Sequence, residues 1–194
     1  MMRNAIIVAG LILFTVIGKS HGQEKKFYAP PSYGIKTNTL YWLATTLNVG
    51  AEISLGKQTT FDLSGTYNPW SFGDNKKIKH WSIQPEFRYW TCERFNGHFW
   101  GIHAFYSEFN MGGIKILGLE KFRYEGNLYG AGIAYGYQWI IGKRFNLEAT
   151  VGIGYARLEY DKYEYQVLGP HIKKDTKNYI GPTKAGFNLV YIIK

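Results

Sequence analysis

Two neighbouring segments near the middle of the chain alternate large apolar residues with small or polar residues at every second position. In the first, Tyr129 to Trp139, aromatic and aliphatic side chains alternate with residues such as Gly130 and Gly132. In the second, Phe145 to Tyr155, the same pattern returns after a short turn. A period of two places successive side chains on opposite faces of a β-strand. The pattern therefore predicts a hairpin with one bulky apolar face and one small or polar face.

The same alternation recurs along the chain and predicts eight strands, at residues 35–44, 48–55, 60–67, 78–90, 99–106, 129–139, 145–155 and 179–193. Most connections alternate in length, with short ones near 56–59, 91–97 and 141–144 and long ones near 68–77, 107–126 and 161–177. The connection near 45–47 is short and departs from this rule. Outer-membrane barrels have short periplasmic turns and longer outer loops. We therefore expect an all-β, eight-stranded antiparallel up-and-down transmembrane β-barrel, with short periplasmic turns and longer outer loops.

Alternation alone fits a soluble lipocalin-like barrel as well, with its apolar face inside. However, eight strands leave an interior just wide enough for side chains to fill, and the many rings of a chain that is 18% aromatic would not fit there together. The rings are therefore expected to face lipid, with those at strand ends forming a belt at each lipid–water boundary. The polar faces then supply a lumen network of opposite charges, which neutralise one another when buried: Glu52, Asp62, Glu86, Arg88, Glu148 and Lys184.

The N-terminus has the features of a secretion signal. Arg3 precedes an apolar stretch from Ala5 to Ile17, and Ser20 and Gly22 supply small residues before a cleavage site. We expect a signal peptide at residues 1–22, a short lead segment at 23–33 and a barrel domain at 34–194. Together with the predicted barrel, export leads us to expect the mature protein in the outer membrane of a Gram-negative type of cell. Export also disfavours nucleic acid as a partner, although the chain carries a formal charge of +9.

The sequence shows no convincing set of catalytic residues and none of the common zinc, phosphate or nucleophile motifs. A lipid-modifying enzyme would need a histidine near one rim, for which His80, His98 and His103 are the candidates. The single cysteine, Cys92, excludes a disulfide framework and a cysteine metal cluster. We expect no enzymatic activity, no cofactor and no metal site.

Eight basic residues fall in the predicted outer loops, where lipid phosphates attract positive charge: Lys76, Lys77, Lys115, Lys121, Arg123, Lys173, Lys174 and Lys177. They are expected to contact the phosphates of outer-membrane lipid and lipopolysaccharide. The alternative interpretation is ordinary solvated loop charge.

Several short motifs carry a family resemblance: Lys36-Thr37-Asn38, Asn68-Pro69-Trp70, the stretch from Gln84 to Trp90, and the stretch from Phe95 to Phe99. They resemble a bacterial domain-of-unknown-function family of small OmpA-like eight-stranded outer-membrane β-barrel proteins. The last strand, with Lys184, Gly186, Leu189 and Tyr191 in a recurring spacing, resembles the C-terminal signal that the barrel-assembly machinery reads during insertion. The chain departs from that signal by continuing to Lys194.

The expected function is that of a small, pore-less outer-membrane barrel with a structural or surface-interaction role. Its loops are expected to contact envelope polysaccharide, a host surface or partner proteins. The resemblance implies a link to a fimbrial protein, with anchoring in the envelope as one role. Three alternatives stay open from the sequence: a narrow solute channel, a lipid-modifying outer-membrane enzyme and a secreted lipocalin-like binding protein.

Overall fold

The computed structural model describes residues 32–71, 76–114, 119–164 and 169–193. The expected signal peptide at 1–22 and nearly all of the expected lead segment at 23–33 lie outside the described residues. The expected barrel domain, from residue 34 onward, lies within them apart from the three internal gaps and the last residue.

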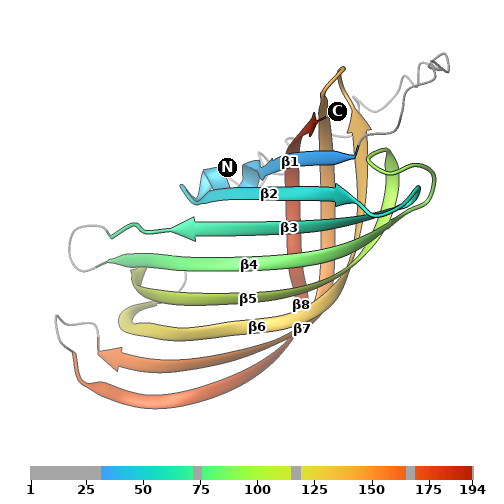
Figure 1. Ribbon diagram of the computed structural model, residues 1–194. Coiled ribbons are helices and arrows are strands. Elements are labelled where there is room, and N and C mark those ends of the chain that lie inside the picture. Colours follow the sequence, from blue (N-terminus) through green and yellow to red (C-terminus); the bar gives the residue numbers. More distant parts are fainter. Residues whose placement is uncertain (1–31, 72–75, 115–118, 165–168, 194) are drawn as a thin grey trace, which may run out of the picture.

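The described chain is built almost entirely of antiparallel strands (Figure 1). The strands are β1 Tyr33–Asn38, β2 Leu47–Ser54, β3 Thr59–Asn68, β4 Lys77–Trp90, β5 Gly97–Ile114, β6 Leu119–Ile140, β7 Phe145–Glu164 and β8 His171–Ile193, with one short helix, α2 Thr39–Leu43. Each strand pairs with the next, and β1 pairs with β8, so the sheet closes into a ring. The prediction of an all-β chain with eight antiparallel strands is thus confirmed. No helix among the described residues is long and apolar enough to cross a membrane.

The first strand is shorter than the alternation predicts. It ends at Asn38 instead of Ala44, and residues 39–43 form α2. Asn38 provides the reason, because its side-chain oxygen accepts a hydrogen bond from the backbone N–H of Leu40 at 3.1 Å and so caps the helix. The expected strand end, with Leu40 and Trp42, is therefore a helical turn within the first connection.

Two of the three predicted long loops are mostly strand, which corrects the ranges 107–126 and 161–177. The ladder of β5 with β6 continues in register from Tyr106–Tyr129 to Gly112–Arg123. The ladder of β7 with β8 likewise continues beyond Tyr155 as far as His171. On β5 and β6 the alternation reverses, with apolar residues such as Phe109 and Tyr124 on the inward face and polar residues on the outward face. On β7 and β8 charged residues stand on both faces, so the outward apolar face that marks the rest of these strands is missing here. As a result β5 to β8 have 18 to 23 residues, against 6 to 14 in β1 to β4.

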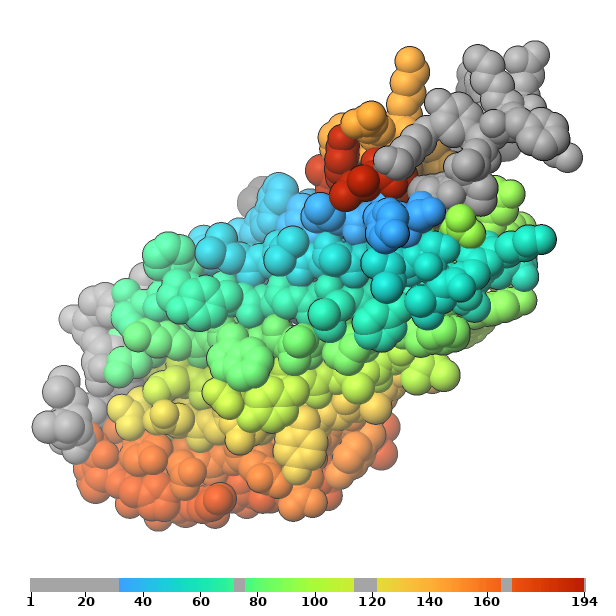
Figure 2. Space-filling view, viewed as in Figure 1, coloured from blue at the N-terminus to red at the C-terminus, as the bar shows by residue number. Residues whose placement is uncertain are grey.

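The two faces of the closed sheet differ sharply in chemistry. Large apolar side chains point outward, with Ile102, Val151 and Ile153 each more than 60% exposed. The space-filling view shows the strands side by side as one continuous outer surface (Figure 2). Small, polar and charged side chains point inward, where Glu52 and Arg88 are fully buried. This arrangement inverts that of a water-soluble domain, which keeps its charges outside.

Glycines allow β6 and β7 to approach very closely. A Cβ atom at Gly154 would lie 2.2 Å from the carbonyl oxygen of Ala131, and one at Gly130 would lie 2.1 Å from that of Tyr155. Real Cβ atoms do not tolerate such contacts, so only glycine fits. Glycine within a strand often marks a tight bend of the sheet, and here it lets this wall curve enough for the ring to close.

Candidate functional site

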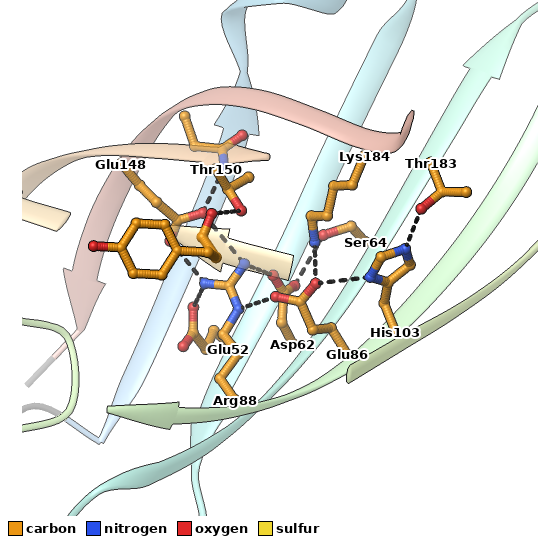
Figure 3. A network of polar contacts seen from close by, with 12 residues as sticks. Glu52, Asp62, Ser64, Glu86, Arg88, His103, Glu148, Thr150, Thr183 and Lys184 are labelled. Carbon is orange, nitrogen blue, oxygen red and sulfur yellow. Dashed lines mark hydrogen bonds and ion pairs between the residues drawn. The ribbon is translucent and has the colours of Figure 1, made fainter. Parts of the chain in front are cut away.

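A buried guanidinium group lies at the centre of the ring. Arg88 forms ion pairs with four carboxylates, at 2.6 Å to Glu86, 2.7 Å to Glu148 and 2.9 Å to both Glu52 and Asp62 (Figure 3). The side chains of all five residues are at most 1% exposed. A buried charge is costly unless it is paired, and here every acceptor has a cationic partner.

Two lysines complete this ion network. Lys36 contacts Glu52 and lies 2.8 Å from Asp62, while Lys184 lies 2.6 Å from Glu86. The network therefore holds three permanent cations against four carboxylates, a formal excess of one negative charge. All six lumen residues predicted from the sequence belong to it. The sequence-based prediction does not include Lys36. Its position between Ile35 and Thr37 on β1 places it on the inward face by the same alternation.

Strand register explains why these side chains meet. Glu52 pairs with Asp62 across β2 and β3, and Asp62 pairs with Glu86 across β3 and β4. Like charges directly opposite one another on neighbouring strands repel. Arg88, two residues along from Glu86 on the same face of β4, offsets that repulsion by reaching all of the carboxylates.

The three candidate catalytic histidines lie in different surroundings. His103 is inside the ring, 3.0 Å from the hydroxyl of Thr183 and 3.8 Å from Glu86 (Figure 3). His98 is exposed on the outward face and lies 2.5 Å from the hydroxyl of Tyr135. His80 lines the cavity described below. In the part of the chain that the structure describes, no group of three or more His, Cys, Asp or Glu is arranged to hold a metal ion.

Apolar side chains fill one end of the ring, the end where the short turns lie. The turn between β4 and β5 places Phe95 inward with a positive φ of 62°, and Asn146 donates a hydrogen bond to its carbonyl at 3.1 Å. Phe95 packs with Val190 and Ile192, and each of the three is at most 4% exposed. The ring centres of Trp90 and Phe99 lie 4.8 Å apart with their planes tilted by 43°, and the ring of Trp90 lies 6.0 Å from that of Phe95. We call these five residues the apolar plug: Trp90, Phe95, Phe99, Val190 and Ile192.

A cavity of about 840 Å³ lies on the other side of the ion network. Lys36, Asp62, Arg88 and Lys184 line it from the network side. Leu40, from α2 in the connection between β1 and β2, lines it as well and is 44% exposed. The interior thus consists of a plug, a layer of buried charge and a cavity toward the longer connections.

Aromatic residues with polar partners border the outward apolar face. Toward the longer connections, Trp81 and Tyr106 both donate to Glu108 at 2.9 Å, and Tyr129 donates to Glu159 at 2.9 Å. At the opposite border Arg144 donates to the hydroxyl of Tyr191 at 2.9 Å, and His98 contacts Tyr135. Between the two borders the outward positions are apolar, as from Phe145 to Tyr155 on β7.

The eight basic residues assigned to outer loops divide between the two faces. Register and alternation place Lys77, Arg123 and Lys174 on the outward face, beyond the aromatic border. Lys173 and Lys177 share the inward face with Tyr160. Lys76 is exposed just before β4. Lys115 and the side chain of Lys121 lie outside the described residues.

Of the basic residues that lie in strands, Lys173 already has an acidic partner. It donates to Asp175 at 2.6 Å, and this hydrogen bond, together with one from the backbone N–H of Thr176, holds the pKa of Asp175 below its usual range. Arg123 lies over the ring of Tyr163, 4.5 Å from its centre. Lys174 is exposed and, among the described residues, has no hydrogen bond or ion pair. Arg123 also lies 3.8 Å from Glu125, so of these three residues Lys174 is the one without an ionic partner in the described part of the chain.

Comparison with known proteins places the chain in a family without giving it an activity. No curated protein and no solved structure matches it. One family model, described as a protein of unknown function (DUF3575), matches residues 8–193. The match covers nearly the whole sequence, and the chain therefore belongs to the DUF3575 family.

Proposed function

We propose that this protein is a small, pore-less outer-membrane β-barrel that serves a structural or surface-interaction role. The carrying observation is the inverted packing of the ring, with aliphatic side chains outside and paired charges inside. In water, the exposed apolar band would be a large aggregation-prone patch. In a bilayer, the same band would contact lipid tails, and its exposure would then carry no hydration penalty.

The dimensions of the outward band support the proposal. A transmembrane β-strand needs about 9–11 tilted residues. The apolar runs from Tyr129 to Trp139 on β6 and from Phe145 to Tyr155 on β7 match that length. Rings whose polar atoms reach Glu108 and Glu159 are suited to the lipid–water boundary, where one end of the side chain is apolar and the other wet. In this orientation the extensions of β5 to β8 stand outside the cell.

The interior supports a sealed barrel over the alternative of a solute channel. The ion network crosses the ring and the apolar plug fills the end beyond it. Eight-stranded barrels are typically filled by side chains in this way.

The surface role rests on the extensions of β5 to β8. Beyond the aromatic border they present Arg123 and Lys174 outward, where lipopolysaccharide phosphates would lie. We propose that these two residues and Lys77 contact lipid phosphates, and that the strand tips reach surface polysaccharide or a fimbrial protein. Insertion would proceed through the barrel-assembly machinery.

A charge placed in the apolar band tests this proposal. In lipid, Val151→Arg is expected to lower the free energy of unfolding by about 2–4 kcal/mol, the cost of arginine at a bilayer midplane. Thr176→Arg, on the outward face beyond the border, is the matched control and is expected to change it by less than about 1 kcal/mol. Urea unfolding in lipid vesicles gives both values.

The gel migration of the unmodified protein gives an independent check. Before boiling, the folded barrel is expected to run at a different apparent size from the boiled chain. Equal tolerance of Val151→Arg and Thr176→Arg, or identical migration before and after boiling, would contradict membrane insertion and favour a secreted soluble barrel.

A further inference from the structure

The cavity above the ion network has two chemically different walls. On β3 and β4 the inward positions carry hydroxyl and amide groups: Ser64, Thr66, Ser82 and Gln84. On β5, β6 and β7 they carry apolar groups: Phe105, Leu128, Ala156 and Leu158. A volume of about 840 Å³ falls in the range of small-molecule sites, which combine apolar surface with a few placed polar groups.

The polar wall contains a group without a partner. The hydroxyls of Thr66 and Ser82 lie 2.5 Å apart, and Ser64 donates to Asp62 at 2.9 Å. The amide of Gln84, which also lines the cavity, makes no hydrogen bond to any of the described residues. An amide offers two donors and an acceptor with two lone pairs. Gln84 is therefore available to a bound molecule that carries both donors and acceptors.

The charges around the cavity disfavour an ionic ligand. Lys36, Arg88 and Lys184 are each paired with carboxylates, and the network as a whole already has one negative charge in excess. The remaining cation of the lining, Lys177, is exposed at the rim. A bound carboxylate or phosphate would find no unpaired buried cation, and a bound amine would find no unpaired carboxylate. Because every buried charge of the lining has a partner, the chemistry favours a neutral molecule.

The apolar wall offers a flat surface at its base. Gly130 leaves room for the ring of Phe105, whose tip would lie 2.8 Å from a Cβ atom at that glycine. Leu158 lines the same wall. A pyranose ring matches both walls at once, because it has an apolar C–H face and an edge of hydroxyl groups that donate and accept hydrogen bonds. A simple alkyl chain would leave the polar wall unpaired, at a cost for each group that loses water.

We propose that this cavity binds a neutral sugar unit, a mono- or disaccharide or the end of a glycan chain. The ring would lie on Phe105 and Leu158, with its hydroxyl groups toward Gln84 and Ser82. Binding itself requires only the folded chain. That the sugar arrives from the cell surface rests on the membrane orientation proposed above.

The test uses the single cysteine as a reporter. Cys92 is exposed in the turn beside the apolar plug, across the ion network from the cavity, so a fluorescent maleimide there leaves the site free. Labelled protein, purified in lauryldimethylamine oxide because sugar-based detergents would compete, is applied to an array of neutral and acidic glycans. We expect retention on a subset of neutral glycans and release by the corresponding free sugar.

Substitutions of cavity-lining residues test whether the glycan binds in this cavity. Gln84→Leu and Phe105→Ala are expected to weaken binding of the retained glycan at least fivefold, about the loss of one hydrogen bond or one ring contact. The matched controls are Gln58→Leu, in an exposed turn at the plugged end, and Phe187→Ala, on the outward face; both should stay within twofold. Each variant is first checked for folding by its migration before and after boiling.

Three outcomes would overturn the proposal: no retention on any neutral glycan, retention on acidic glycans alone, or Gln84→Leu and Phe105→Ala binding like their controls. None of them touches membrane insertion, which the Val151→Arg comparison and the boiling test decide separately. A protein that inserts but retains no neutral glycan would refute the sugar site alone.

Discussion

Among single residues, Arg88 is the side chain on which the buried charge depends. Its guanidinium pairs with four carboxylates, and without it only Lys36 and Lys184 would remain to offset them. Arg88→Leu is expected to lower the free energy of unfolding by roughly 3–5 kcal/mol, the usual cost of breaking a buried pair. Urea unfolding of the protein in lipid vesicles measures it.

Arg157→Leu is the matched control. Arg157 forms an ion pair of similar length, 2.9 Å to Glu159, but its side chain is 46% exposed. Exposed pairs contribute about 0–1 kcal/mol. If the two leucine variants lost the same stability, the network would not carry the role that its burial indicates.

The sequence predicts part of this network, because strand parity alone fixes the face on which each residue lies. The inward position of Glu52, Asp62 and Arg88 can be predicted because each stands between apolar residues on its strand. The sequence indicates His103 only as a candidate catalyst, since parity does not reveal its partner. Its contact with Thr183 depends on a bulge in β8, between the pairings of Lys184 and Pro182, which no local pattern marks.

Among the elements, the contact between β6 and β7 depends on glycine. A Cβ atom at Gly154 would meet the carbonyl oxygen of Ala131 at 2.2 Å, whereas one at Gly142, in the turn between the same strands, would meet nothing within 4 Å. Gly154→Ala is therefore expected to reduce the folded fraction at least tenfold, and Gly142→Ala to leave it unchanged. The ratio of unboiled to boiled gel bands measures both, and equal ratios would show that the wall can relax.

Strand ends mark where local patterns stop being informative. Alternation predicts β2, β3, β4 and the parts of β6 and β7 next to the turn that joins them to within a few residues, because each has one apolar face. The extensions of β5 to β8 lack the outward apolar face, and their inward face mixes apolar with charged residues, so the outward pattern ends before the paired backbone does. The helix α2 falls where a single capping residue, Asn38, outweighs the strand propensity of the residues that follow.

For the molecule as a whole, the layered interior predicts that the barrel does not conduct. An ion crossing it would have to displace the paired charges around Arg88 and then pass Trp90, Phe95 and Phe99, all at most 1% exposed. Each charge separated from its partner would cost several kcal/mol. Reconstituted in a planar bilayer, the protein is expected to give no steady current, whereas a 16-stranded porin in the same bilayer conducts through its aqueous channel. A stable unitary current from the unmodified protein would contradict the sealed interior and restore the channel alternative. Current only after Phe95→Ala and Phe99→Ala are combined would instead locate the seal in the apolar plug.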